Sequence, residues 1–190
     1  MRPSMAYADQ RVGIFIDAQN LYHSSKNLYS GRVNYQELIK NLTGGRRLIR
    51  AMAYVVKSEG VEGVVPREPS ARDARTGVRG LSSESAFFDA LTKAGLELRL
   101  KDLQIYPDGM RKADWDVGMA VDAIRMASFL DVVILVTGDG DFLPLVDYLK
   151  WGMGRLVEVA AFHRSASAKI REAADHFINI EDIPRALIRR

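Results

Sequence analysis

The chain has 190 residues, enough for one domain with a substantial buried core. Its composition is ordinary for a globular protein, and no apolar run approaches the roughly 20 residues that a membrane helix needs. The absence of cysteine excludes disulfides, thiolate metal sites and cysteine nucleophiles. Because the first ten residues also lack the apolar core of a signal peptide, we expect a cytoplasmic protein without a membrane partner. The net charge of +3 favours a nucleic-acid partner only weakly.

Strand patterns alternate with helix patterns along the chain. We predict helices at residues 20–29, 34–42, 83–91, 116–129, 142–151 and 165–174. Strands are predicted at residues 12–17, 48–56, 96–103, 132–137 and 156–162, and the third of these alternates apolar with charged residues, as an edge strand does. This alternation predicts βαβ units and a mostly parallel sheet with helices on both faces, an α/β fold.

One domain is predicted over residues 11–180, between a flexible N-terminus at 1–10 and a C-terminal tail at 181–190. An insertion at about 60–80 is rich in Gly, Pro and Ser and carries four arginines: Arg67, Arg72, Arg75 and Arg79. A long segment of this kind is either a mobile solvated loop or an arm that contacts substrate. Both interpretations stay open, and so does a homodimer formed through the exposed edge strand.

Three acidic clusters occupy comparable positions in the predicted fold. The apolar strands at 12–16 and 132–136 lead directly into Asp17 and into Asp139 and Asp141, and Asp116 opens a strongly periodic helix. Ligands of open α/β sheets bind at the carboxyl ends of the strands, and Mg²⁺ and Mn²⁺ prefer carboxylate oxygens. We therefore predict a site for Mg²⁺ or Mn²⁺ held by Asp17, Asp116 and Asp139, with Asp141 as a fourth catalytic acid.

Other polar residues near these acids are supporting candidates, each with a structural alternative. Asn20 and Asp141 could cap helices, and Asp114 stands at a helix start that favours anions in any case. Asp122 points about 120° away from Asp116 on the same helix, which places it at the rim of the site or against a neighbouring group. The remaining candidates are Thr137 as a supporting residue, Lys112 as a phosphate ligand, and Tyr22, Trp115 and Phe142 as stacking or core residues.

Three motifs in order resemble one known family. They are GIFIDAQNLY at residues 13–22, KADWDVGMAVD at 112–122 and TGDGDF at 137–142, and they are similar to the motifs of NYN domains of the LabA-like (DUF88) branch. The resemblance covers residues 11–180 and departs from the common pattern at Ala18-Gln19.

This resemblance implies a PIN-like, Rossmann-like three-layer α/β/α fold. It further implies a metal-dependent ribonuclease acting on RNA, with Asp17, Asp116 and Asp139 at the metal and Asn20, Asp141 and Asp122 in support. A binding or regulatory module that keeps the acidic pocket without cutting is the main alternative. A phosphohydrolase for small molecules is disfavoured, because Ala18-Gln19 follows Asp17 where such enzymes commonly have a second aspartate at the next position but one.

Overall fold

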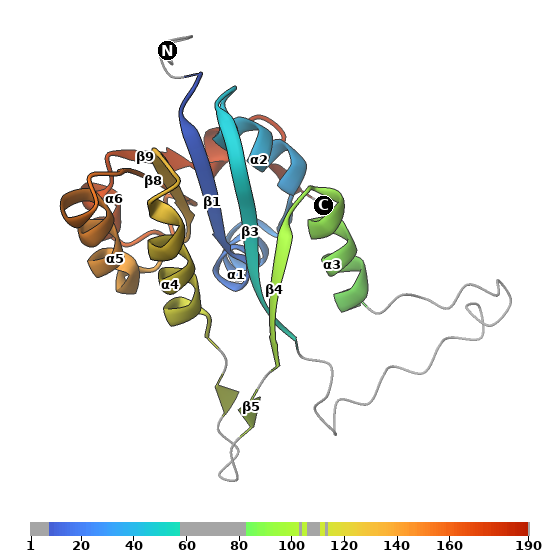
Figure 1. Cartoon of the computed structure of the whole chain (residues 1–190). Helices are drawn as coiled ribbons and strands as arrows, with labels where there is room; N and C mark the ends of the chain where they lie inside the picture. Colours follow the sequence, from blue (N-terminus) through green and yellow to red (C-terminus); the bar gives the residue numbers. More distant parts are fainter. Residues whose placement is uncertain (1–7, 58–82, 103, 106–110, 113, 190) are drawn as a thin grey trace, which may run out of the picture.

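A six-stranded parallel sheet forms the centre of the protein (Figure 1). The structure, a computed structural model, describes residues 8–57, 83–102, 104–105, 111–112 and 114–189. In sheet order the strands are β4 (Glu97–Asp102), β3 (Arg47–Lys57), β1 (Arg11–Asp17), β7 (Val132–Val136), β8 (Leu156–Ala161) and β9 (His176–Asn179). The five predicted strands are all present, and the alternating segment is an edge strand as expected.

Two layers of helices cover the sheet and complete a three-layer α/β/α fold. Side chains of α1 (Ala18–Tyr29), α2 (Tyr35–Thr43) and α3 (Ser83–Lys93) share one hydrophobic cluster with one face of the sheet. The opposite face packs against α4 (Asp116–Ala127), α5 (Leu143–Asp147) and α6 (Ala168–Ala173). Because β1 and β7 are covered on both sides, their residues form the continuous apolar runs seen in the sequence.

The helix ends follow local capping chemistry. Asn34 caps α2 by accepting a hydrogen bond from the Glu37 amide (3.3 Å), and the helix ends at Gly44, which has a left-handed φ of 59°. The predicted helix at 142–151 is divided: a 3-10 turn at Gly140–Phe142 precedes α5, and a π-helical turn at Tyr148–Gly152 follows it.

Two short strand pairs were not predicted. β2 (Gly31–Val33) pairs antiparallel with β10 (Leu187–Arg189), so the segment expected as a tail is joined to the domain. β5 (Gln104–Ile105) pairs with β6 (Arg111–Lys112), and this ribbon extends past the carboxyl end of β4 (Figure 1). Strands of two or three residues give too short a pattern to read from sequence.

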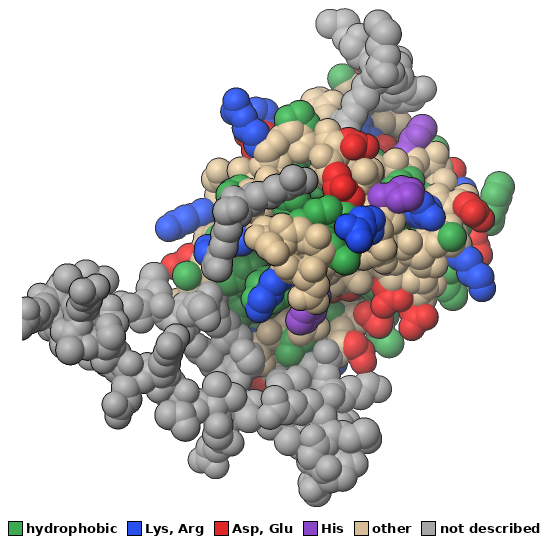
Figure 2. Space-filling model, turned by 180° about the vertical axis from the view of Figure 1, so that it is seen from behind, with side chains coloured by type: hydrophobic (Ala, Val, Ile, Leu, Met, Phe, Trp, Pro, Cys, Tyr) green, Lys and Arg blue, Asp and Glu red, His purple; other side chains and the backbone are tan. Residues whose placement is uncertain are grey.

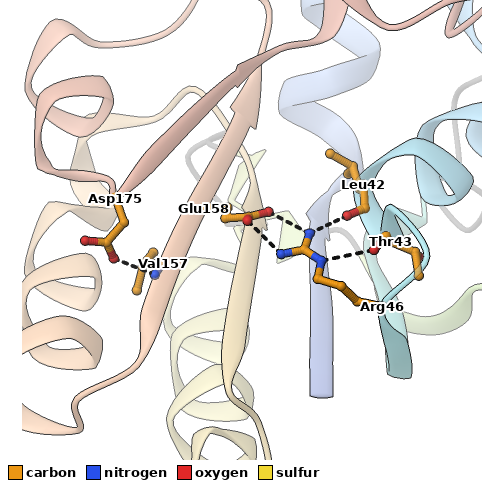
Figure 3. Close-up of polar contacts among 6 residues, drawn as sticks. All are labelled: Leu42, Thr43, Arg46, Val157, Glu158 and Asp175. Carbon is orange, nitrogen blue, oxygen red and sulfur yellow. Dashed lines mark hydrogen bonds and ion pairs between the residues drawn. The ribbon is translucent and has the colours of Figure 1, made fainter. Parts of the chain in front are cut away.

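A salt bridge with little exposure ties α2 to the far half of the sheet (Figure 3). Both guanidinium Nη atoms of Arg46 donate to the Glu158 carboxylate, at 2.7 and 2.9 Å. The same guanidinium group donates to the carbonyl oxygens of Leu42 and Thr43 at the end of α2. Arg46 therefore satisfies the helix terminus and the carboxylate of β8 together.

The strand order creates a switch point between the central strands β1 and β7. The chain leaves β1 for β3 on one side and later returns to β7 on the other side, so the order of strands reverses between β1 and β7. Clefts at such switch points, outside the carboxyl ends of the strands, are where open α/β sheets bind ligands.

The described part of the chain contains no helix long and apolar enough to cross a membrane. The insertion expected at about 60–80 lies outside the described residues, as do residues 1–7.

Candidate active site

A cleft of about 220 Å³ opens at the switch point. Acidic residues from three separate segments line it: Asp17 after β1, Asp114 and Asp116 at the start of α4, and Asp139 after β7. The remaining lining residues are Gln19, Asn20, Tyr54 and Trp115. None of the described residues that line the cleft is a lysine or an arginine.

Asp17 lies between the sheet and α1. Its Oδ1 accepts a hydrogen bond from the Asn20 amide (3.0 Å), which makes Asp17 the N-cap of α1, and its Oδ2 accepts from the Thr137 hydroxyl (3.4 Å). The cap explains why α1 begins at residue 18, two residues earlier than predicted. Capping and a site role are compatible here, because each carboxylate oxygen keeps lone-pair capacity for a further partner.

The loop after β7 is held by a second set of polar contacts. Thr137 is fully buried, and its hydroxyl accepts from the Asp139 amide (3.2 Å). Asn20 belongs to α1 rather than capping it, and its side-chain oxygen accepts from the Gly138 amide (3.1 Å). Thr137 and Asn20 thus join the two loops that present Asp17 and Asp139.

Asp141 differs from its predicted role as a helix cap. The chain after β7 first makes the 3-10 turn, so the capping position falls on Asp139, whose Oδ1 accepts from the Asp141 amide (3.0 Å). Asp141 is exposed and does not line the cleft, although its charge contributes to the environment of Asp116. Its assignment as a catalytic acid stays a prediction.

Trp115 forms a fixed wall between Asp114 and Asp116. Its indole N–H donates to the Val55 carbonyl oxygen (3.0 Å), and its ring meets Tyr54 edge-on at 5.5 Å between centroids. Gly118 lies against the ring: a Cβ at that position would stand 2.5 Å from the nearest ring carbon. The ring therefore occupies space that any larger residue at position 118 would take.

Two of the carboxylates, those of Asp17 and Asp116, sit in an environment that opposes their ionisation. Burial is the largest cause that raises the pKa of Asp17 above its ordinary value of 3.8, and hydrogen bonds from Asn20 and Thr137 oppose this rise. Burial also raises the pKa of Asp116, and the negative charges of Asp17, Asp114, Asp139 and Asp141 add to the effect. A site that crowds four or five carboxyl groups in this way favours a cation among them.

The carboxylates of the cleft fit an Mg²⁺ or Mn²⁺ ion that keeps part of its water shell. Within the described ranges, no three Asp, Glu or His side chains are placed to hold one ion directly. Mg²⁺, however, usually keeps several waters and takes only one or two protein carboxylates, together with substrate oxygens. An open cleft lined by Asp17, Asp116 and Asp139 suits this hydrated binding and does not suit a closed cage of protein ligands.

The other predicted site residues lie away from the cleft or outside the described part of the chain. Asp122 accepts a hydrogen bond from the Tyr54 hydroxyl (3.1 Å) and pairs with Arg99 at 3.4 Å.

Lys112 belongs to β6, and its part in substrate binding stays a prediction. Phe142 is a core residue with 2% exposure, and Tyr22 packs on Phe87. The four arginines expected to hold substrate, Arg67, Arg72, Arg75 and Arg79, lie outside the described residues.

Sequence reasoning missed two residues that line the cleft, Gln19 and Tyr54. Tyr54 stands level with Asp17 in the register of β3 on β1, and it is 1% exposed. Burial and the Asp122 carboxylate raise the pKa of its phenol strongly, so it remains a neutral donor. The sequence feature that could have indicated Tyr54 is its place as a polar aromatic residue inside the apolar run of β3.

Gly118→Ala is expected to displace the Trp115 wall of the cleft, although alanine is the better helix former. In α4 the change should favour the helix by up to about 1 kcal/mol, but the new methyl group must displace the Trp115 ring. We expect a shift in the intrinsic tryptophan fluorescence maximum. Gly152→Ala, which lies beside the other tryptophan, is the control for the fluorescence; an unchanged spectrum in Gly118→Ala would show that the ring tolerates the methyl group.

The described fold and cleft define a class: a Rossmann-like α/β protein with an acidic site at its switch point. Within that class, the NYN domain family model matches residues 11–181, and the chain belongs to the NYN domain family. NYN domains are part of the PIN-like nuclease superfamily.

Two known proteins are similar to this chain over most of its length. The chain is 23% identical over 188 residues to the low amplitude and bright protein LabA of Synechococcus elongatus, covering 94% of this chain and 88% of the relative. It is also similar to the crystal structure of a protein of unknown function from Vibrio parahaemolyticus, with a TM-score of 0.77 and 28% identity. That likeness covers 99% of this chain and 100% of the other.

Proposed function

We propose that this protein is a ribonuclease that uses Mg²⁺ or Mn²⁺ to hydrolyse phosphodiester bonds of single-stranded RNA. The observation that carries the proposal is the cleft itself, where four aspartates from three chain segments converge at the carboxyl ends of β1 and β7. Membership of a family within the PIN-like nuclease superfamily supports the same chemistry.

In this proposal Asp17, Asp116 and Asp139 hold a hydrated cation, with one or two of them as direct oxygen ligands and the rest acting through bound water. When bound, the ion would lower the pKa of a water molecule and neutralise charge on the phosphate. The chain contributes rigidity: Asp17 and Asp139 are each fixed by a capping hydrogen bond, and Asn20 and Thr137 join their loops. Carboxylates held this way need little rearrangement when the cation and substrate arrive.

The test is incubation of the purified protein with labelled single-stranded RNA and Mn²⁺ or Mg²⁺, in parallel with EDTA. Cleavage that needs the metal is expected. RNA binding without cleavage under all metals would favour the alternative of a regulatory binding module. Absence of both binding and cleavage would overturn the RNA assignment.

Mn²⁺ is expected to raise the melting temperature of the protein. A ligand that binds only the folded state stabilises it by about 2.7 kcal/mol at a hundred times its dissociation constant, and relief of the repulsion among the acids is one contribution to that affinity. The measurement is thermal unfolding with and without Mn²⁺ for the wild type and for Asp116→Asn. The shift should shrink in Asp116→Asn and persist in the control Asp147→Asn, an exposed carboxylate of α5. An equal shift in all three proteins would place the ion elsewhere.

A further inference from the structure

The edge of the sheet formed by β4 carries a polar shelf beside the cleft. Successive side chains of a strand point to opposite faces, and Leu98 of β4 packs in the cluster of α1, α2 and α3. Glu97, Arg99 and Lys101 therefore face the side of α4, where the core cluster includes no residue of β4. We call these three residues the β4 shelf.

Two members of the β4 shelf are paired with opposite charges. Glu97 pairs with Arg50 at 2.6 Å, and Arg99 pairs with Asp122 at 3.4 Å. Lys101, at the carboxyl end of the strand, makes contacts of another kind. Its Nζ donates to the Asp114 carbonyl oxygen (3.1 Å) and lies over the Trp115 ring, 5.8 Å from the centroid. Both of these partners are uncharged groups.

These contacts place the Lys101 ammonium group beside the cleft with little freedom. Its platform, Trp115, is fixed by the Val55 carbonyl, by Tyr54 and by the close approach of Gly118. Asp114 and Trp115 both line the cleft, so Lys101 touches two of its walls. An ammonium group has three N–H donors, and within the described residues its one bond to a carbonyl oxygen leaves donors for a phosphate.

A polyanion that enters this cleft meets carboxylates and no cationic side chain among the described lining residues. Figure 2 shows the opposite face of the molecule from Figure 1, where lysine and arginine side chains lie among acidic and apolar ones. Nucleic-acid backbones are held chiefly by lysine and arginine contacts to phosphates. A cationic side chain held next to the acids would therefore supply the phosphate contact that the described lining residues do not provide.

We propose that Lys101 binds a backbone phosphate of the RNA strand next to the bond that is cut, so that the strand enters the cleft over the carboxyl end of β4. The inference rests on the proposed ribonuclease function and adds to it the side from which the substrate arrives. Trp115 holds the ammonium group at a fixed distance from the carboxylates, which sets the register of the strand against the metal site.

The test compares Lys101→Gln with Lys40→Gln. Lys40 is an exposed residue in the last turn of α2, next to the end of the sheet where β3 begins, so both variants remove one positive charge but at opposite ends of the sheet. Binding of fluorescein-labelled single-stranded RNA is measured in EDTA, which prevents cleavage, from 50 to 200 mM salt. Removal of one phosphate contact reduces the slope of log K against log salt by about 0.7.

We expect Lys101→Gln to show that reduced slope, with roughly tenfold weaker binding at low salt and a raised KM at nearly unchanged kcat. Lys101→Arg should restore the slope, and Lys40→Gln should match the wild type. If the wild type binds and cleaves RNA but Lys101→Gln has the slope and KM of Lys40→Gln, the entry side is wrong and the function stands. If the wild type neither binds nor cleaves RNA, the proposed function fails and this inference fails with it.

Discussion

Asp17→Asn is expected to lower the rate of RNA cleavage by at least roughly a hundredfold while leaving the fold intact. Asp17 lines the cleft at the end of β1, where its carboxylate faces the acids of α4 and of the loop after β7. In the proposed mechanism, loss of one ligand charge would remove several kcal/mol of the stabilisation that a bound metal gives to the transition state, and each 1.36 kcal/mol is a factor of ten in rate.

The same substitution is expected to keep or raise the free energy of unfolding in EDTA. Asparagine caps helices about as well as aspartate, so the hydrogen bond from the Asn20 amide survives. Because the pKa of Asp17 is raised in the folded state, ionisation of this group destabilises the fold. Its contribution to stability is present below the ordinary pKa of 3.8 and is lost as pH rises through the raised value. The free energy of unfolding of the variant should therefore rise relative to that of the wild type as pH increases from 3.8 through the raised pKa. The difference should persist at neutral pH.

Two measurements on one preparation separate these effects. Cleavage of labelled RNA with Mn²⁺ gives the activity, and urea unfolding in EDTA at pH 4 and pH 7 gives the stability. Asp147→Asn, which removes an exposed carboxylate of α5, serves as the control for both. A variant that unfolds in EDTA at neutral pH would show that Asp17 is a structural residue and not a metal ligand.

Most of the architecture was accessible from the sequence because it depends on local patterns. Continuous apolar runs marked β1 and β7, and alternation marked β4 as an edge strand. Acids placed directly after buried strands inherit the position of the strand end, so Asp17 and Asp139 meet at the switch point as expected. Asp116 joined them because its helix returns the chain to the neighbouring strand.

The parts that escaped prediction depend on contacts between distant segments or on single turns. The 3-10 turn after β7 moved the cap from Asp141 to Asp139, a shift of two residues that no periodic pattern records. Tyr54 reaches the cleft through the register of β3 on β1, and Lys101 reaches Trp115 only because β4 lies next to β3. Pairing of this kind is fixed by the whole sheet, so a local reading cannot supply it.

Glu158→Ala is expected to lower the free energy of unfolding by about 3–5 kcal/mol, the largest stability effect that we anticipate. The side chains of Glu158 and Arg46 are only 11% and 12% exposed, and they meet through two short hydrogen bonds (Figure 3). Truncation of the carboxylate leaves a guanidinium charge with little access to water. The cost comes from that unpaired charge more than from the lost attraction.

Urea unfolding of Glu158→Ala and of Glu97→Ala compares the loss of a buried ion pair with the loss of an exposed one. Glu97 forms an equally short ion pair with Arg50, but these side chains are 49% and 53% exposed, so water screens them and the expected cost is below about 1 kcal/mol. The double variant Arg46→Met with Glu158→Leu should recover part of the lost stability, because it removes both charges together but also removes the guanidinium donors to the carbonyl oxygens of Leu42 and Thr43. Equal losses in Glu158→Ala and Glu97→Ala would mean that burial does not govern this pair, and that α2 is held to the sheet by its apolar contacts alone.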